Sequence, residues 1–143
     1  MTHNKIPVPY MGQRPVRAYD EPAGSDLRIS ETITIAPGQK VLAPTGTALT
    51  APDGTFAMLA LRSSMPKKNI SIPNGIGVID PDYTGVIFVW LHNFGTEPVV
   101  LDEGERIAQV IFVPYVTPQF YAVKNLTATK RGAGGFGSSG TGE

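Results

Sequence analysis

The segment 74–85, with the sequence NGIGVIDPDYTG, carries the most unusual group of polar residues in the chain. Within it, Asp80 and Asp82 flank Pro81 and lead directly into Tyr83. An aspartate is ionised at neutral pH and can accept a proton from water, so a base here needs no histidine. The glycines of the segment would let the backbone approach a ligand closely. The same residues also make a good hairpin turn with no function, and composition alone favours that simpler interpretation.

A second candidate is an anion site at Arg62, Ser63 and Ser64, which end an apolar run. Arginine supplies a permanent charge, and hydroxyls with backbone N–H groups at a helix N-terminus can bind phosphate oxygens. Pro66 suits the first turn of a helix, so we expect one helical turn here with Ser64 as its cap. The alternative is an ordinary helix cap beside a surface arginine, and these residues alone leave both interpretations open.

Two further polar residues stand where chemistry is possible. In the segment 106–113 (RIAQVIFV), alternation predicts that Ile107, Gln109 and Ile111 share one face, so Gln109 interrupts an apolar stripe. Because buried amides need partners, Gln109 is either a satisfied core residue or an amide that holds a ligand or a water. Asp26 is either a turn residue or an acidic group near a metal.

The segment 124–143 is rich in glycine and has almost no hydrophobic periodicity. Residues 132–137 match G-x-G-x-x-G, but a dinucleotide fingerprint needs a strand before it, a helix after it and an acidic residue about 20 positions later. The chain ends six residues after this match, so we reject that interpretation. A flexible tail is the simple alternative, although Arg131 and Phe136 could hold an anion and a ring.

Composition excludes several classes of site and partner. With no cysteine and only two histidines, we expect no disulfide, no cysteine-based zinc site and no Ser-His-Asp triad. Twelve basic and twelve acidic residues give zero net charge, which argues against direct binding to nucleic acid or to an anionic membrane. No apolar run approaches the roughly 20 residues of a membrane span, and no signal peptide is evident. We therefore expect a cytoplasmic protein.

The elements that must position these residues are short. The 143 residues suffice for one domain, and 16 glycines with 13 prolines interrupt long helices and strands. Turn signals recur about every 8–12 residues, which is typical of an all-β sandwich or barrel. We expect a β domain over residues 1–123 and a flexible glycine-rich arm over residues 124–143. The apolar runs 56–61 and 86–91 indicate strands buried on both faces. The other expected strands cover residues 29–35, 40–43, 47–50, 99–101 and 106–113.

Five short motifs contain all these candidates in one order along the chain. They are 23–27 (AGSDL), 62–65 (RSSM), 74–85, 104–109 (GERIAQ) and 131–140 (RGAGGFGSSG). In this order and spacing the sequence resembles the trimeric deoxyuridine triphosphatase (dUTPase) family over nearly its whole length. Each motif is weak by itself, whereas five in order are very specific.

The resemblance implies a jelly-roll-like β subunit, a homotrimer with active sites between subunits, and hydrolysis of dUTP to dUMP and pyrophosphate with Mg²⁺. Such an activity would limit uracil incorporation into DNA and supply dUMP for dTMP synthesis. By position, Asp80 would activate the water that attacks the α-phosphate, and Tyr83 would pack under the deoxyribose. Asp26 would contact the hydrated metal.

The resemblance also implies ligands for each part of the substrate. Gln109 would help to hold the attacking water as well as the phosphates. The residues that would read uracil are Asn74, Gly77, Val78, Ile79 and the backbone near Phe88. The phosphates would be held by Arg62, Ser63, Ser64 and Gln109, and the arm residues Arg131, Phe136 and Gly137 would close over the site.

Three residues depart from the family pattern. Ser25 stands where an apolar residue is common, Ala133 replaces a usual Ser or Thr, and Thr84 replaces a common Arg or Gln. None is the implied base, so these departures concern affinity more than the type of reaction.

Three alternatives belong to other functional classes. One is a regulator on the same scaffold that binds a partner protein, with or without catalysis; the intact Asp80 and arm argue against an inactive enzyme. Another is a dCTP deaminase, which shares the fold but would need a catalytic glutamate where residues 102–113 follow the dUTPase pattern. A purely structural jelly roll, such as a capsid protein, is the most distant.

Overall fold

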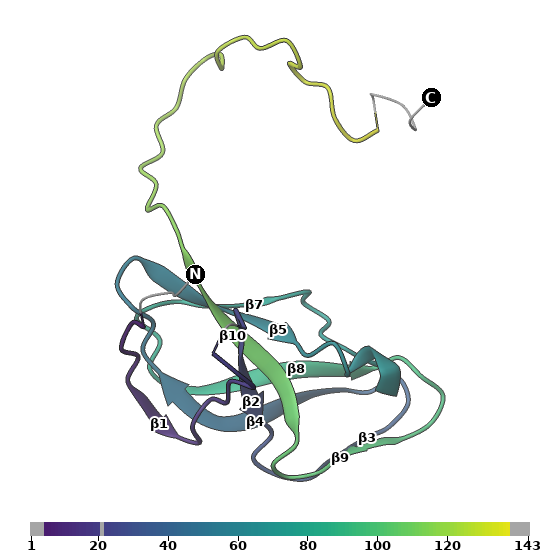
Figure 1. Cartoon of the computed structure of the whole chain (residues 1–143). Helices are drawn as coiled ribbons and strands as arrows, with labels where there is room; N and C mark the ends of the chain where they lie inside the picture. The colour runs from purple at the N-terminus through teal and green to yellow at the C-terminus, as the bar shows by residue number, and fades with distance from the viewer. Residues whose placement is uncertain (1–4, 21, 138–143) are drawn as a thin grey trace.

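The computed structural model describes residues 5–20 and 22–137, which form an all-β fold with one short helical turn (Figure 1). The all-β prediction is confirmed, and the strands form the layers of a sandwich and not a closed barrel. The strands in this described part are β1 (Tyr10–Gly12), β2 (Ser25–Arg28), β3 (Ile33–Ile35), β4 (Lys40–Leu49), β5 (Thr55–Leu61), β6 (Ile70–Ser71), β7 (Gly77–Ile79), β8 (Val86–Asn93), β9 (Val99–Leu101) and β10 (Arg106–Pro114).

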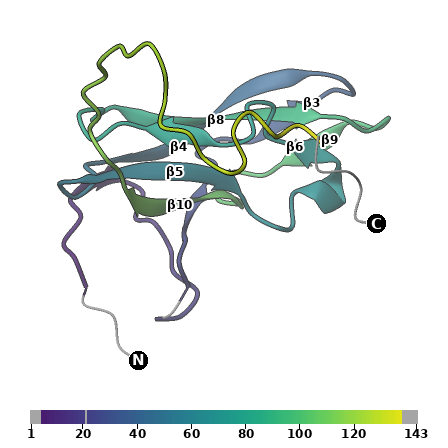
Figure 2. The ribbon, with the colours of Figure 1, turned by 90° about the horizontal axis from the view of Figure 1, so that it is seen from above.

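Two four-stranded sheets make the two layers, and every pairing in them is antiparallel. One sheet has the order β1-β4-β8-β6 and the other β2-β10-β5-β7, while β3 and β9 form a separate two-stranded sheet. Figure 2 shows β4 and β8 on one side of the sandwich and β5 and β10 on the other. The segment between β7 and β8 therefore crosses from one layer to the other.

The two apolar strands β5 and β8 each bury one face. In β8 the side chains of Ile87, Val89 and Leu91 are buried, whereas Phe88 and Trp90 are each 45% exposed. In β5, Ala57 and Leu59 are buried, and the other residues are partly buried. The prediction that both strands are buried on both faces is wrong for the single chain, because each strand has a partner layer on one side only.

Strand β4 joins two predicted strands, 40–43 and 47–50, into one. Pro44 does not end it, because the ladder to β8 is irregular between Pro44 and Ala48. Such an irregularity accommodates a residue that has no N–H to donate. Inside it, the buried Thr45 donates its hydroxyl to the Ile87 carbonyl at 2.8 Å. The bulge thus keeps the strand continuous past the proline.

The predicted strand 29–35 is shorter in the structure and covers only Ile33–Ile35. Ile29 is fully buried but bonds elsewhere: its N–H donates to the Glu105 carbonyl, and its carbonyl accepts from Gly104, both at 2.9 Å. The alternating pattern therefore indicates burial correctly and strand length wrongly. The sequence pattern also does not predict the four short strands β1, β2, β6 and β7.

The helical turn expected after Arg62 is present as the 3₁₀ turn η1 (Pro66–Lys68), with proline at its start. Ser64 is not its cap. The capping position is Met65, which makes no side-chain capping bond and is 1% exposed. Burial of this methionine anchors the turn to the core, so a hydroxyl cap is not needed.

Strand β10 ends at Pro114, and the chain then leaves the sandwich (Figure 1). Tyr115 still packs edge-on against Phe56, with ring centroids 6.2 Å apart. From there to residue 137 no strand forms, and the arm extends away from both sheets. The predicted boundary after residue 123 and the flexibility of the arm stay predictions. In the described residues, no helix is long and apolar enough to span a membrane.

Candidate active site

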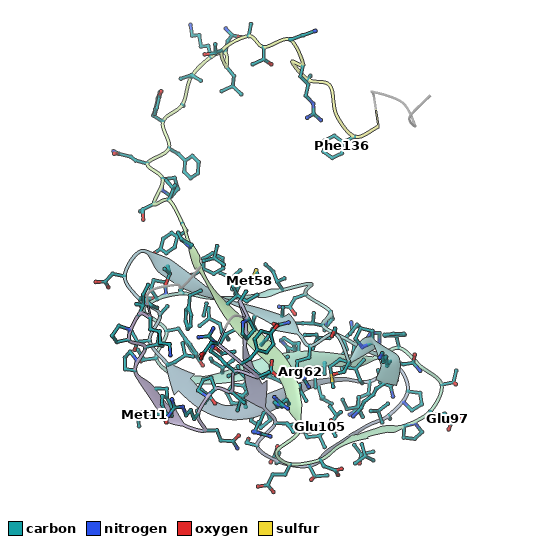
Figure 3. All side chains as sticks on the ribbon, viewed as in Figure 1. Met11, Met58, Arg62, Glu97, Glu105 and Phe136 are labelled. Carbon is teal, nitrogen blue, oxygen red and sulfur yellow. The ribbon has the colours of Figure 1, made fainter. Side chains whose placement is uncertain are left out.

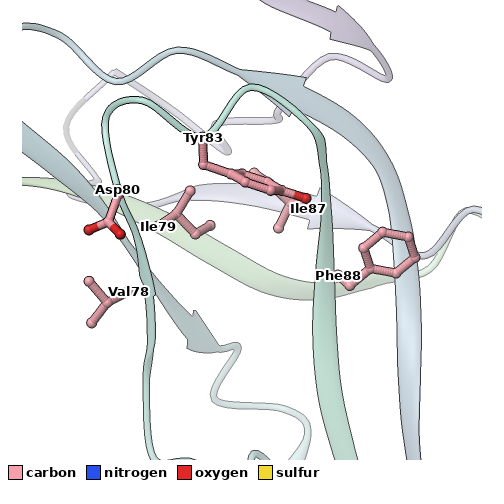
Figure 4. Close-up of a pocket in the computed structure, with 6 residues that line it drawn as sticks. All are labelled: Val78, Ile79, Asp80, Tyr83, Ile87 and Phe88. Atoms are coloured by element: carbon pink, nitrogen blue, oxygen red, sulfur yellow. The ribbon is translucent and has the colours of Figure 1, made fainter.

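A cavity of about 260 Å³ lies between β7 and β8, at the crossing from one layer to the other (Figure 4). Val78 and Asp80 lie on the β7 side, Tyr83 lies on the turn, and Phe88 lies on β8. The lining is apolar except for one carboxylate and one phenol, so it suits a flat ring with a sugar attached. The residues that line the cavity are Val78, Ile79, Asp80, Tyr83, Ile87 and Phe88.

Local sequence explains why this cavity forms. Strand β7 pairs with β5, with Val78 opposite Met58 and Ile79 opposite Ala57, so Asp80 comes directly after the last paired residue. A turn follows, closed by the Tyr83 N–H, which donates to the Asp80 carbonyl at 3.0 Å. The turn brings the carboxylate and the aromatic ring to the same cavity.

Two residues expected to read a base do not line the cavity. The Asn74 amide donates to the Ile76 carbonyl at 3.0 Å and so stabilises its own turn. A Cβ atom on Gly77 would lie 3.0 Å from Cβ of Leu59, so glycine is needed there for close packing of β7 on β5. In this chain both residues shape the hairpin that carries Val78 and Ile79.

A second cluster of charged groups lies where β2 and β10 meet the end of β5. Oδ2 of Asp26 is 3.0 Å from Nε of Arg62 and 3.5 Å from Nη1 of Arg106. The carboxylate side chain is 15% exposed, and each guanidinium side chain is about a third exposed. Sequence reasoning missed Arg106 as a member of this cluster. Its place in the GERIAQ motif was the available signal.

Gln109 joins the same cluster. It lies opposite Asp26 in the β2–β10 ladder, and its side-chain amide donates to the Leu61 carbonyl at 3.1 Å. A Cβ atom on Gly24 would lie only 2.1 Å from Oε1 of Gln109, so glycine leaves the space that this amide occupies. The amide is held by the end of β5, directly before Arg62.

The predicted stripe of Ile107, Gln109 and Ile111 is wrong. A register shift between Arg106 and Ala108 lets both Ile107 and Ala108 be buried, whereas Gln109 and Ile111 are only partly buried. Gln109 therefore lies outside the core stripe. This position favours the interpretation of Gln109 as a ligand-holding amide.

Ser63 and Ser64 follow Arg62 in the loop that leads to η1. The Met65 N–H donates to the Arg62 carbonyl at 3.1 Å, so these serines lie in a tight turn. Across the described residues, neither hydroxyl makes a hydrogen bond within the chain. Both hydroxyls are free to bind an anion beside the Arg62 guanidinium.

The cavity and the charged cluster lie at opposite ends of β5. Asp80 comes level with Phe56 at the start of the strand, whereas Arg62 follows its last residue. At about 3.3 Å per residue, the intervening six residues separate the two sites by about 20 Å. One chain therefore does not bring Asp80 together with Arg62, Gln109 and Asp26.

The arm residues form a third separate group. Figure 3 shows Phe136 on the arm, far from Arg62 in the sandwich, and its side chain is fully exposed. The Arg131 side chain donates to the Gly134 carbonyl within the arm, at 2.5 Å. Gly137 has a φ of 89°, which glycine adopts readily. In this chain the arm meets neither the cavity nor the charged cluster.

The available side chains suit a hydrated magnesium ion better than a metal ion coordinated only by protein side chains. Among the described residues there is no group of three or more His, Cys, Asp or Glu side chains that could hold a metal. Mg²⁺ commonly keeps several waters and binds through one or two carboxylates plus substrate phosphates. Asp26 supplies one such carboxylate, beside the guanidinium groups of Arg62 and Arg106.

Comparison with known proteins identifies the family of this chain. The dUTPase family model matches residues 12–140. The chain belongs to the dUTPase family. A curated dUTPase named deoxyuridine 5'-triphosphate nucleotidohydrolase, from Desulfitobacterium hafniense, is 46% identical over 122 residues, covering 82% of this chain and 81% of its own. The enzyme of the same name from Pasteurella multocida is 43% identical and covers 95% of this chain and 97% of its own.

Solved dUTPase structures share the fold. The dUTPase of Staphylococcus bacteriophage 80alpha with dUPNHPP has a TM-score of 0.85 and 26% identity, covering 96% of this chain and all of its own. A mutant dUTPase from phage phi11 of S. aureus, described with a structural Mg(II) ion, has a TM-score of 0.80 at 21% identity, with coverage of 86% and 100%. The predicted family, the jelly-roll fold and the enzyme class are confirmed: this dUTPase is a hydrolase that converts dUTP to dUMP.

Proposed function

We propose that this dUTPase works as a homotrimer whose active sites combine the cavity of one subunit with the charged cluster of another and the arm of a third. The observation that carries this proposal is the separation of Asp80 from Arg62 by the length of β5. A substrate whose base fills the cavity needs its phosphates bound nearby, and the backbone of the same chain's Arg62 lies about 20 Å along β5 from the level of Asp80. A neighbouring copy supplies the guanidinium.

In this proposal Asp80 is the general base. The nucleobase and the sugar fill the cavity, with the sugar on the Tyr83 ring, and the exposed Asp80 carboxylate faces a water at the α-phosphate. The water oxygen bonds to the α-phosphorus while its proton passes to Asp80. The bond from this phosphorus to the α–β bridging oxygen breaks, and pyrophosphate leaves with that electron pair.

Arg62, Gln109, Ser63 and Ser64 hold the phosphates and the water. Arg62 is paired with Asp26 in the free chain, so a phosphate must share or replace that contact. Two serine hydroxyls and a planar guanidinium are well suited to phosphate oxygens. This proposal keeps all four residues in the roles expected from the motifs.

Asp26 would hold magnesium through water, as the single carboxylate of the cluster. When bound, the ion neutralises part of the triphosphate charge. The two guanidinium groups already balance the Asp26 charge, so Mg²⁺ alone should bind weakly and the triphosphate should strengthen its binding.

The arm completes the site by covering it. Arg131 would meet the phosphates and Phe136 the base, and Gly137, with its positive φ, would let the chain turn directly after Phe136. Covering the substrate excludes water other than the attacking one. The physiological consequence we propose is a low dUTP level, which limits uracil incorporation into DNA and supplies dUMP for dTMP synthesis. The cytoplasmic location stays a prediction from the sequence.

The decisive assay measures pyrophosphate release from dUTP, dTTP, dCTP and UTP at equal concentrations, with the subunit number measured by light scattering. We expect rapid release from dUTP alone, by a trimer. A monomer with full activity would contradict the shared site, and ammonia release from dCTP would indicate a deaminase.

A further inference from the structure

The phenol of Tyr83 is held in place by two neighbours along the chain. Its hydroxyl donates to the Val86 carbonyl at 2.6 Å, which fixes the far end of the ring. Between these two residues lies Gly85, and the ring packs against its backbone. Figure 4 shows the hydroxyl of Tyr83 directed across the turn toward β8.

The absence of a side chain at Gly85 makes room for the Tyr83 ring, and an added Cβ atom would collide with that ring. A Cβ atom built there would lie 2.8 Å from the Tyr83 hydroxyl oxygen, 3.0 Å from Cζ and 3.3 Å from Cε2. The backbone conformation does not require glycine at position 85, because the φ of Gly85 is not in the positive range that favours glycine. The need for glycine is therefore steric, and it comes from the tyrosine ring.

We infer that Gly85 is a positioning residue that sets the sugar specificity of the enzyme by fixing the pose of Tyr83. This inference rests on the proposed packing of Tyr83 under the deoxyribose. A ring clamped by the Val86 carbonyl and by Gly85 cannot move back to admit a 2′-hydroxyl. A methyl group at position 85 pushes the ring off both contacts, so the cavity wall beside the sugar is no longer fixed.

Gly85→Ala tests this inference with little risk to the fold. The atoms in conflict belong to the end of a half-exposed side chain, so the ring can move without disturbing the core. We expect kcat/KM for dUTP relative to UTP to fall about tenfold, the size of effect that one misfitted group has in a binding pocket. The thermal midpoint should stay near that of the unmodified protein.

Gly38→Ala is the matched control. Gly38 has a φ of 77° and open space around its Cβ position, so alanine there strains the backbone without touching the cavity. We expect Gly38→Ala to lower stability more than Gly85→Ala and to leave the dUTP-to-UTP ratio unchanged. An equal change of ratio in both variants would overturn the inference.

Tyr83→Phe gives a readout that a purely structural glycine would not affect. Removing the hydroxyl removes the closest contact of a Cβ atom at position 85, at 2.8 Å, and leaves its contact with Cζ at 3.0 Å. Gly85→Ala should therefore lower the ratio by a smaller factor in the Tyr83→Phe background than in the unmodified enzyme. Equal factors in the two backgrounds, or no effect of Gly85→Ala, would show that the glycine does not act through this ring.

Tyr83→Ala separates failure of the inference from failure of the proposed function. If Tyr83→Ala narrows the gap between dUTP and UTP while Gly85→Ala leaves it unchanged, Tyr83 has its proposed role and the inference about Gly85 is wrong. If Tyr83→Ala weakens both substrates equally, the packing of Tyr83 under the sugar is wrong, and the inference fails with it.

Discussion

Nε of Arg62 lies 3.0 Å from Oδ2 of Asp26, so the guanidinium that we propose to bind phosphate is paired in the free chain with the carboxylate that we propose to hold the metal. Binding of a charged substrate must therefore rearrange a pair that already exists. Nucleotide and metal should consequently affect each other's affinity through these two residues.

The first prediction concerns Asp26→Asn. Removing the carboxylate should lower the Mg²⁺ enhancement of binding of an imido analogue of dUTP by about 10–100-fold, as for other groups that orient metal-bound water. Without Mg²⁺, the variant should bind the analogue at least as tightly as the unmodified enzyme, because one negative charge beside the phosphates is gone. Titration calorimetry with and without Mg²⁺ measures both effects. Glu31→Gln, an exposed change of the same chemistry, should alter neither.

The second prediction concerns Asp80→Asn. The amide keeps the shape of the side chain but cannot accept the proton of the attacking water, so kcat should fall by about 10²–10⁴-fold. Affinity for the analogue and the subunit number should stay the same. Asp82→Asn is the matched control, because Asp82 is exposed two residues away and does not line the cavity. Equal losses in the two variants would remove Asp80 from the role of base.

The third prediction concerns the arm. A chain ending at Asn125 should still form trimers and bind dUMP, because the described arm contacts neither the cavity nor the charged cluster. Its kcat/KM for dUTP should fall by about 10²-fold, the effect of a poorly positioned substrate. Ordering the backbone of this glycine-rich arm costs roughly 1–2 kcal/mol of conformational entropy per residue, so the arm should become ordered only when the triphosphate binds.

Mixed trimers test whether the arm acts on a neighbouring subunit. Co-refolding the truncated chain with full-length Asp80→Asn should restore part of the activity, since intact arms then cover intact Asp80 sites. Mass spectrometry identifies the mixed trimers. If verified mixed trimers are inactive, the arm serves its own subunit or has no role in turnover.

The fourth prediction concerns stability and Asn93. This buried side chain donates to the carbonyls of Ile35 at 2.9 Å and Glu97 at 2.8 Å, and accepts from the Gly95 N–H at 2.9 Å. Asn93→Ala removes all three hydrogen bonds from a fully buried position, so the free energy of unfolding should fall by on the order of 3 kcal/mol. Urea unfolding measures the change. Asn125→Ala, on the exposed arm, should have no effect.

Alternation along the chain is a good guide to burial and a poor guide to strand length. Ile29, Ile33 and Ile35 face inward as their spacing predicts, yet only three residues of that segment form a strand. The irregularities in β4 and β10 explain why the sequence predicts two strands in place of β4 and why the predicted stripe of Ile107, Gln109 and Ile111 is wrong. They place two extra residues in β4 and one extra residue in β10 relative to the partner strand, and no local pattern encodes the partner.

Residue types and their order along the chain were enough to show which residues could do chemistry. Asp80, Tyr83, Arg62, Gln109 and Asp26 follow from residue type and from the order of five motifs, since charge, hydrogen-bonding capacity and turn preference are local properties. These were sufficient to identify the family and the reaction.

Which of these residues meet depends on the fold. The structure adds Arg106 to the charged cluster, places Gln109 outside the core, and puts Asp80 and Arg62 at opposite ends of β5. Register between strands far apart in the chain sets each of these relationships, and register depends on packing across both sheets. The proposal that each site is shared between subunits rests on these relationships, and the inference about Gly85 rests on its contact with the Tyr83 ring.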